Sequence, residues 1–172
     1  FELSGGMQQR AMIAMAMSCD PEILIADEPT TALDVTVQAQ VLEQLNKLRK
    51  ESNTALIIIT HNLGVVARYA DTVKIMYGGK IVESGTPFDI FENPQHPYTI
   101  GLFRSIPDLT SKQRRLEIIP GIMPDPSNLP KGCNFCTRCQ YATERCKQEK
   151  PPVAQLSKSH AVLCWRNAEQ EA

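Results

Sequence analysis

Two short segments of the chain carry residue types that suit nucleotide chemistry. Residues 3–10 read LSGGMQQR, in which a Ser-Gly-Gly turn opens a helix and leaves backbone amides free to approach a phosphate group. Sixteen residues separate this segment from Asp27 and Glu28, which directly follow the apolar run at 23–26. Carboxylates at a strand end suit a magnesium ion and an attacking water. The two segments predict part of a nucleotide-hydrolysing site, although the phosphate loop G-x-x-x-x-G-K-[ST] is absent from this sequence.

Two carboxylates and one histidine have different expected roles in nucleotide hydrolysis. Because neighbouring side chains on a strand point to opposite faces, we expect Asp27 to bind Mg²⁺ and Glu28 to act as general base toward water. His61 follows a second apolar run, at 55–60, and is expected to contact the terminal phosphate and to hold Glu28 in place. Plainer interpretations stay open: surface carboxylates, a core histidine, and a helix-capping role for Asp34.

Five of the six cysteines lie in the C-terminal third of the chain, and Cys19 stands alone. An odd-numbered cluster without a secretory signal favours metal ligands over a disulfide framework. Cys133, Cys136 and Cys139 match the first three ligands of a bacterial ferredoxin-type iron–sulfur run, but the spacing to Cys146 does not match it. Zinc held by four thiolates and free, partly buried cysteines are the alternatives.

The elements that would position these residues predict an α/β fold. Residues 5–17 have a helical pattern and are apolar on most sides, which predicts a buried helix. Buried strands are expected at 23–26 and 55–60. Between them a helix begins at Asp34 and repeats apolar residues at helical spacing up to about residue 49. This order predicts a right-handed βαβ unit with a parallel sheet, and ligands collect at the carboxyl ends of such strands.

The remainder of the chain predicts a hairpin and then a loop-rich extension. Residues 73–77 and 80–84 are joined by Gly78-Gly79, which is typical of a two-residue hairpin turn. Prolines recur beyond Thr86, with one short helix expected near 98–105. We expect two domains, 1–110 and 111–172, the second of which holds the cysteine cluster.

Composition indicates a globular protein whose two parts differ in charge. The 172 residues carry a net charge of −1, and the apolar run at 11–17 is too short to span a bilayer. Residues 1–110 hold 8 Lys and Arg against 13 Asp and Glu, whereas residues 111–172 hold 10 against 6. The cations of the second part are scattered, which favours a solvated surface over a nucleic-acid interface. No signal peptide opens the chain, which begins almost inside a motif, so we expect further residues upstream.

Four segments in a fixed order resemble the motifs of ABC-type ATPases. Residues 3–10 resemble the ABC signature, 23–29 the Walker B motif, 31–34 the D-loop, and Thr60-His61 the switch histidine. The resemblance covers nearly the whole chain and narrows to the ATP-binding subunits of oligopeptide, dipeptide and nickel importers. The segments that carry this narrower resemblance are HPYT at 96–99, Ile106-Pro107, PGIMP at 120–124 and GCNF at 132–135, followed by Arg138-Cys139 and Cys146.

The resemblance implies the C-terminal part of an ABC-type ATPase domain that binds ATP and Mg²⁺ and works as a head-to-tail dimer. The signature of one subunit would close over ATP held by the other. Glu28 and His61 would be catalytic in a site completed by a Walker A motif upstream, so this chain alone would not hydrolyse ATP. The residues implied to bind nucleotide or its Mg²⁺ are Ser4, Gly5, Gly6, Gln8, Asp27 and Asp34.

The same resemblance implies partners, a location and a metal group. The partners are a second ABC ATPase subunit, membrane permeases and, indirectly, an extracytoplasmic solute-binding protein, with no nucleic acid; the location is the cytoplasmic face of the cell membrane. The family's cysteine spacing implies a [4Fe–4S] cluster, with Zn²⁺ as the alternative. Its implied ligands are Cys133, Cys139, Cys146 and Cys164, with Cys136 as a further candidate.

The implied function is ATP hydrolysis that powers import of di- or oligopeptides, or of nickel. A soluble ABC-type ATPase acting on DNA or ribosomes is one alternative, and an iron–sulfur redox or structural module is another. The HPYT segment at 96–99 and the cysteine-bearing tail favour the transporter.

Overall fold

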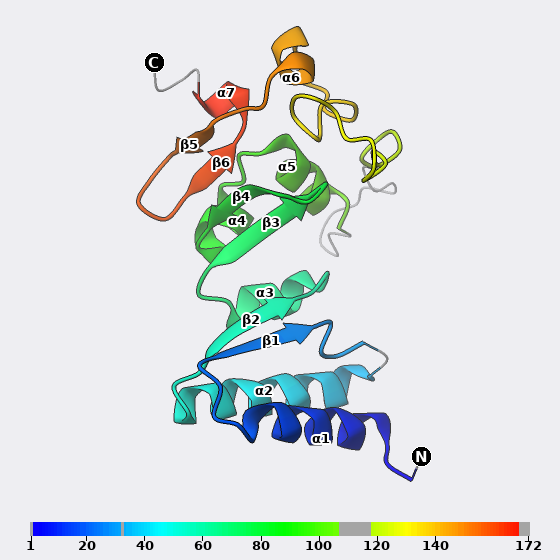
Figure 1. Cartoon of the computed structure of the whole chain (residues 1–172), viewed down its shortest axis with the longest axis vertical. Coiled ribbons are helices and arrows are strands. Elements are labelled where there is room, and N and C mark those ends of the chain that lie inside the picture. The colour runs from blue at the N-terminus through cyan, green and yellow to red at the C-terminus, as the bar shows by residue number, and fades with distance from the viewer. Residues whose placement is uncertain (1, 32, 107–117, 169–172) are drawn as a thin grey trace, which may run out of the picture. The chain divides into compact units, whose positions relative to one another are not determined.

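The computed structural model describes residues 2–31, 33–106 and 118–168. Contacts divide the chain into two compact units, Phe1–Tyr69 and Ala70–Ala172 (Figure 1). The predicted boundary between residues 110 and 111 falls outside the described residues and stays a prediction. No helix in the described ranges is long and apolar enough to cross a membrane.

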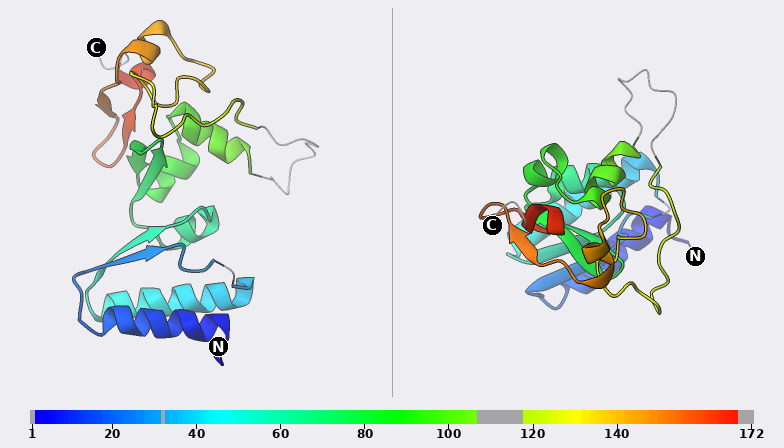
Figure 2. Two further views of the ribbon diagram at one scale, coloured as in Figure 1. Left: turned by 45° about the vertical axis from the view of Figure 1, so that its right-hand side comes forward. Right: turned by 90° about the horizontal axis from the view of Figure 1, so that it is seen from above.

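The first unit contains the predicted βαβ unit with one helix before it and one after it. Strands β1 (Ile23–Asp27) and β2 (Ala55–Ile59) pair in parallel. Helix α2 (Val35–Glu51) is the crossover between them, while α1 (Gly5–Met17) precedes β1 and α3 (Leu63–Tyr69) follows β2. Both views of this unit show α1 and α2 side by side along one face of the sheet (Figures 1 and 2). The prediction of a parallel βαβ unit is confirmed.

The core of the first unit lies between these two helices and the sheet. Apolar side chains one turn apart on α2 form a single stripe, which the sheet and α1 cover. The side chains that meet there are Ile13, Leu24, Val41, Leu45 and Leu56.

Helix α1 is less buried than its sequence predicts. Ile13 is its buried residue, whereas Met7, Met12 and Met15 are 51%, 51% and 65% exposed. The helix is apolar on most sides, but α2 and the sheet cover one side, so the methionines on the other sides face outward. The prediction of a buried helix is wrong for this chain.

The second unit is built on an antiparallel sheet with strand order β3-β4-β6-β5. Strands β3 (Val73–Tyr77) and β4 (Lys80–Gly85) form the predicted hairpin. Its turn residues Gly78 and Gly79 have φ angles of 54° and 75°, as a type I′ turn requires. Strands β5 (Val153–Gln155) and β6 (Ala161–Leu163) form a second hairpin that extends the sheet through pairing of β6 with β4.

Short helices complete the described part of the second unit: α4 (Pro87–Glu92), α5 (Pro97–Arg104), α6 (Glu144–Gln148) and α7 (Trp165–Ala168). Helix α5 is the one predicted near 98–105. Helix α4 is not predicted, although Thr86 and Asp89 form a capping box and Pro87 stands in its first turn. The passage predicted to be loop-rich therefore holds more regular structure than expected.

Candidate nucleotide site and cysteine cavity

The residues that resemble the ABC signature form the N-terminus of α1. Ser4 is its N-cap, and the Ser4 hydroxyl oxygen accepts a hydrogen bond from the Met7 amide at 3.4 Å. Gly6 also has a packing reason to lack a side chain, because a Cβ there would lie 2.5 Å from Cγ1 of Val37 on α2. Ser4 and Gln8 are exposed, so both are accessible to a ligand, and their contacts with nucleotide stay predictions.

Asp27 and Glu28 lie at the carboxyl end of β1, but they are not neighbours within the strand. The strand ends at Asp27, whose side chain is exposed, and Glu28 follows with a left-handed φ of 45°. The Glu28 amide donates to the Ile59 carbonyl at 2.9 Å, which anchors it beside the end of β2. Strand alternation therefore does not place the Glu28 side chain, because a left-handed residue interrupts the pleat. Such a conformation is uncommon for glutamate and is typical of functional sites.

Three hydrogen bonds hold the carboxylate of Glu28. Oε1 accepts from the backbone amide of His61 at 3.1 Å and from His61 Nδ1 at 2.7 Å. Oε2 accepts from the hydroxyl of Thr31 at 3.3 Å. These bonds, the one from the His61 side chain above all, lower the pKa of Glu28. Glu28 is therefore ionised near neutral pH and able to accept a proton.

The contact with Glu28 also determines where His61 carries its hydrogen. A carboxylate can only accept hydrogen bonds, so Nδ1 of His61 must be the donor. In neutral His61 the other ring nitrogen, Nε2, is then an acceptor, and it can donate to a phosphate oxygen only when the ring is protonated. The side chain is 86% exposed, which leaves Nε2 accessible to a ligand.

Asp34 and Asp27 differ in what occupies their carboxylates. Oδ1 of Asp34 accepts from the amides of Thr36 and Val37 at 3.1 and 3.0 Å, so the helix-capping interpretation accounts for these contacts. Asp27 presents an exposed carboxylate at the strand end. A single carboxylate fits Mg²⁺, which keeps several waters and uses one or two carboxylates together with phosphate oxygens.

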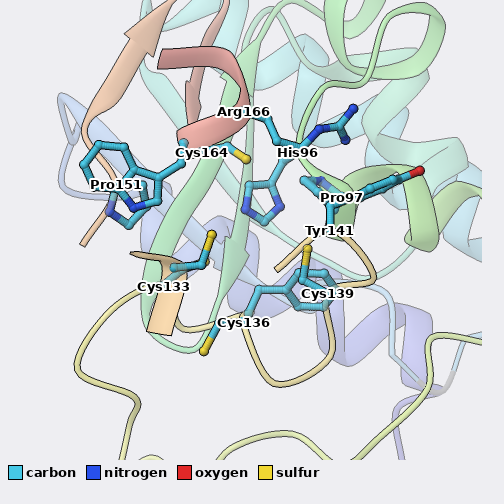
Figure 3. Close-up of a pocket in the computed structure, with 12 residues that line it drawn as sticks. His96, Pro97, Cys133, Cys136, Cys139, Tyr141, Pro151, Cys164 and Arg166 are labelled. Atoms are coloured by element: carbon cyan, nitrogen blue, oxygen red, sulfur yellow. The ribbon is translucent and has the colours of Figure 1, made fainter. Parts of the chain in front are cut away.

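The five cysteines of the tail line one cavity in the second unit (Figure 3). Its volume is about 20 Å³, far below that of a small-molecule pocket. In Figure 3 the sulfur atoms of Cys133, Cys139 and Cys164 face the space between them, whereas that of Cys136 points away. Burial raises the pKa of Cys133 to about 11 and also raises the pKa of Cys139 and Cys164. These thiols stay neutral at pH 7 unless a cation binds them.

A metal ion at these cysteines is not confirmed. Across the described ranges, no three His, Cys, Asp or Glu side chains are arranged to hold one metal ion. A tetrahedral zinc site would bring four sulfurs to about 2.3 Å from a common centre. The [4Fe–4S] cluster and its zinc alternative are therefore proposals that depend on the types of ligand present.

A buried polar network beside the cavity is not predicted from the sequence. Glu83 of β4 is 1% exposed, and its carboxylate accepts from the amides of Gln95 at 2.7 Å and His96 at 2.9 Å. Its third donor is Nε2 of His160, at 2.8 Å. The carboxylate thereby connects β4 to the start of α5 and to the C-terminal hairpin. No local signal distinguishes Glu83 from a surface glutamate, because His160 is 77 residues away in sequence.

His96 connects this network to the cavity wall. It is the N-cap of α5, and its Nδ1 accepts from the Tyr98 amide at 3.1 Å. Burial lowers the pKa of His96 to about 4, so the ring is neutral at pH 7 and Nε2 carries its hydrogen. Pro97 occupies the first turn of α5, and the Tyr98 ring packs against Tyr77 and Phe135. His96 and Pro97 of the HPYT segment thus form part of the cavity wall.

Comparison with known proteins assigns the family. The family model described as "ABC transporter" matches residues 1–31, and the model described as "Oligopeptide/dipeptide transporter, C-terminal region" matches residues 82–146. The chain belongs to the ATP-binding proteins of the oligopeptide/dipeptide ABC transporter family. The family resemblance seen in the motifs is confirmed.

Relatives of this peptide-transporter family match along almost the whole chain. The putative peptide import ATP-binding protein BMEII0863 of Brucella melitensis is 54% identical over 171 residues, which is 96% of this chain and 51% of that protein. The oligopeptide transport ATP-binding protein OppD of Haemophilus influenzae is 54% identical over 169 residues, or 98% and 52% of the two chains. The chain therefore spans about half the length of the curated relatives it matches.

A solved structure supports the ABC-type fold. The ADP conformation of MJ1267, an ATP-binding cassette of an ABC transporter, superposes with a TM-score of 0.51 at 23% identity. The superposition covers 59% of this chain and 40% of the MJ1267 chain. The predicted class, the C-terminal part of an ABC-type α/β domain, is confirmed.

Proposed function

We propose that this chain is part of the ATP-hydrolysing subunit of an ABC transporter that imports di- or oligopeptides. The observation that carries the proposal is the Glu28–His61 contact at the carboxyl edge of β1 and β2. The relatives named for peptide import and oligopeptide transport support peptides as the transported substrate. Nickel, which the sequence resemblance also implies, is the alternative cargo. The match at 82–146 to a transporter region favours this function over an ATPase acting on DNA or ribosomes.

Glu28 takes the proton of the attacking water in the proposed reaction. The water oxygen forms a bond to the terminal phosphorus of ATP while the bond from that phosphorus to the bridging oxygen breaks, so ADP and phosphate are the products. The proton passes to the Glu28 carboxylate, which is held by the two donors of His61. Mg²⁺ bound at Asp27 would neutralise charge on the phosphates.

We infer that the subunit works in pairs at a membrane. Ser4, Gly5 and Gly6 would approach ATP held by a second ABC ATPase subunit in a head-to-tail dimer, because an exposed helix start of this kind suits phosphate. Membrane permeases at the cytoplasmic face and, indirectly, an extracytoplasmic solute-binding protein would complete the assembly. The names of the relatives support this assembly only as far as the transporter class.

The test uses the full-length protein that contains this segment. Glu28→Gln keeps the shape of the side chain but removes the base, so ATP hydrolysis should fall about 10²- to 10⁴-fold while ATP binding persists. Glu22→Gln, the same change at an exposed residue before β1, is the matched control and should keep wild-type hydrolysis. A wild-type rate in Glu28→Gln would overturn the proposal.

We also propose that Cys133, Cys139, Cys146 and Cys164 hold a [4Fe–4S] cluster that stabilises the tail. All four line one cavity, and cysteine thiolates are the ligands of such clusters. The full-length protein purified without oxygen should be brown and absorb near ~400 nm. Cys139→Ser should lose that absorbance, whereas Cys19→Ser should keep it. A colourless protein with stoichiometric zinc would replace the cluster by Zn²⁺, and a metal-free protein would overturn both.

A further inference from the structure

The hydrogen bonds to Glu28 point to one more residue of the hydrolysis site. We propose that the Thr31 hydroxyl positions the Glu28 carboxylate so that a lone pair of Oε2 faces the attacking water. The inference rests on the proposed ATPase function. Thr31 would act through Glu28, so it is a positioning residue and not a catalytic one.

The donors are distributed unequally over the two carboxylate oxygens. Two carboxylate oxygens offer about four lone-pair sites in all. Oε1 already accepts two hydrogen bonds, both from His61, at 3.1 and 2.7 Å. Oε2 accepts one, from Oγ1 of Thr31 at 3.3 Å. Within the described residues, the one lone pair without a donor is therefore on Oε2, next to the lone pair that accepts from Thr31.

The backbone holds the Thr31 hydroxyl near Glu28. The Thr31 amide donates to the Glu28 carbonyl at 3.1 Å, which closes a four-residue turn. Pro29 stands at the second position of that turn, where its restricted φ suits the geometry, and both Pro29 and Thr30 are buried. On the other side, the bond from the Glu28 amide to Ile59 anchors the turn to β2. The carboxylate and the hydroxyl therefore belong to one anchored turn.

This arrangement predicts an effect on turnover and not on nucleotide binding. Thr31 is exposed, so replacing its hydroxyl by a methyl group leaves packing nearly unchanged. Without the hydroxyl, the carboxyl group can rotate about its last bond, and the free lone pair of Oε2 spends less time directed at the water. The affinity for ATP does not depend on that rotation.

The experiment measures ATP hydrolysis by the full-length protein in its transporter complex. Thr31→Val, which has the same shape but no donor, should lower kcat about threefold to tenfold with KM for ATP unchanged. Thr31→Ser restores a hydroxyl and should keep at least about half of the wild-type kcat. Thr36→Val, the same change at an exposed threonine in the first turn of α2, is the matched control and should behave as wild type.

A second pair of variants separates this inference from the proposed function. In a Glu28→Gln background, Thr31→Val should change the residual rate by less than about twofold, because the base it positions is gone. A wild-type kcat in Thr31→Val, or a Thr31→Ser as slow as Thr31→Val, would overturn the positioning role alone. A lower melting temperature of Thr31→Val with unchanged kcat would also overturn it. If Glu28→Gln itself hydrolyses ATP at the wild-type rate, both proposals fail.

Discussion

Single hydrogen bonds set the chemistry of the two histidines that stand beside the candidate sites. His61 donates from Nδ1 to the Glu28 carboxylate, whereas Nδ1 of His96 accepts from the Tyr98 amide. In their neutral forms the two rings therefore present opposite character at Nε2, an acceptor in His61 and a donor in His96. Both residues are histidines in the sequence, but their hydrogen-bond partners determine whether Nε2 accepts or donates a hydrogen bond.

Burial of His96 should make the stability of the protein depend on pH. The pKa of His96 is about 4 in the fold and about 6.5 in an unfolded chain, so the native state binds fewer protons. The contribution of neutral His96 to the free energy of unfolding is complete above about pH 6.5. It is lost as the pH falls toward 4, a decrease of about 3 kcal/mol in all. His96→Asn keeps an acceptor at the N-cap and should flatten this dependence, measured by urea unfolding of the full-length protein at several pH values.

The control for this prediction is His61→Asn, a change at an exposed histidine. Between about pH 7 and pH 5, where Glu28 is ionised with or without His61, it should retain the wild-type loss of unfolding free energy. Equal pH dependence in His96→Asn and wild type would contradict the assignment to His96.

Local signals explain which elements are predictable. Strands β1 and β2 are apolar runs, α2 begins at a capping aspartate, and the turn between β3 and β4 is a pair of glycines at positive φ. Strands β5 and β6 have three residues each, too few for a periodic pattern, and β6 is held by pairing with β4. Helix α4 is different, because Thr86, Pro87 and Asp89 are a start signal that the sequence contains.

The close approach of α1 and α2 predicts a specific cost for a side chain at Gly6. Gly6→Ala would place Cβ 2.5 Å from Cγ1 of Val37, so either the Val37 side chain or one of the two helices must shift. We expect the free energy of unfolding to fall by about 1–3 kcal/mol. Val37→Ala removes the obstructing methyl group, so the cost of Gly6→Ala should be much smaller in that background. Urea unfolding of the wild type, the two single variants and the double variant measures the coupling between Gly6 and Val37.

Gly5→Ala serves as the control for Gly6→Ala. Its Cβ would lie 3.3 Å from Cδ2 of Leu33, a tight but tolerable contact, so its cost should be the smaller of the two. Strictly additive effects of Gly6→Ala and Val37→Ala would contradict the proposed contact.

On the scale of the whole molecule, the second unit has its own sheet and its own core. The four strands described in this unit come from residues 73–163. The buried side chains Val73, Ile75, Val82, Ile90 and Val162 belong to that unit alone. The unit therefore has the components of an independent fold, and the first unit contains Glu28 and His61.

Residues 70–172 should consequently fold without residues 1–69. A dispersed amide NMR spectrum and a cooperative thermal transition would be the expected result. A shorter chain ending at residue 150 is the matched comparison; it lacks β5, β6 and His160, leaves Glu83 without one of its three donors, and should lose both signatures. An unfolded 70–172 chain would contradict the division into two units.

The amino-acid sequence alone accounts for features whose causes lie within a few residues. These are the caps at Ser4 and Asp34, the apolar strands, the Gly78-Gly79 turn, and the family motifs that align with them. The left-handed Glu28, the exposure of α1 and the Glu83–His160 pair are determined only by the tertiary structure. Burial and hydrogen-bond partners depend on which distant segments meet in space, and no short stretch of sequence contains that information.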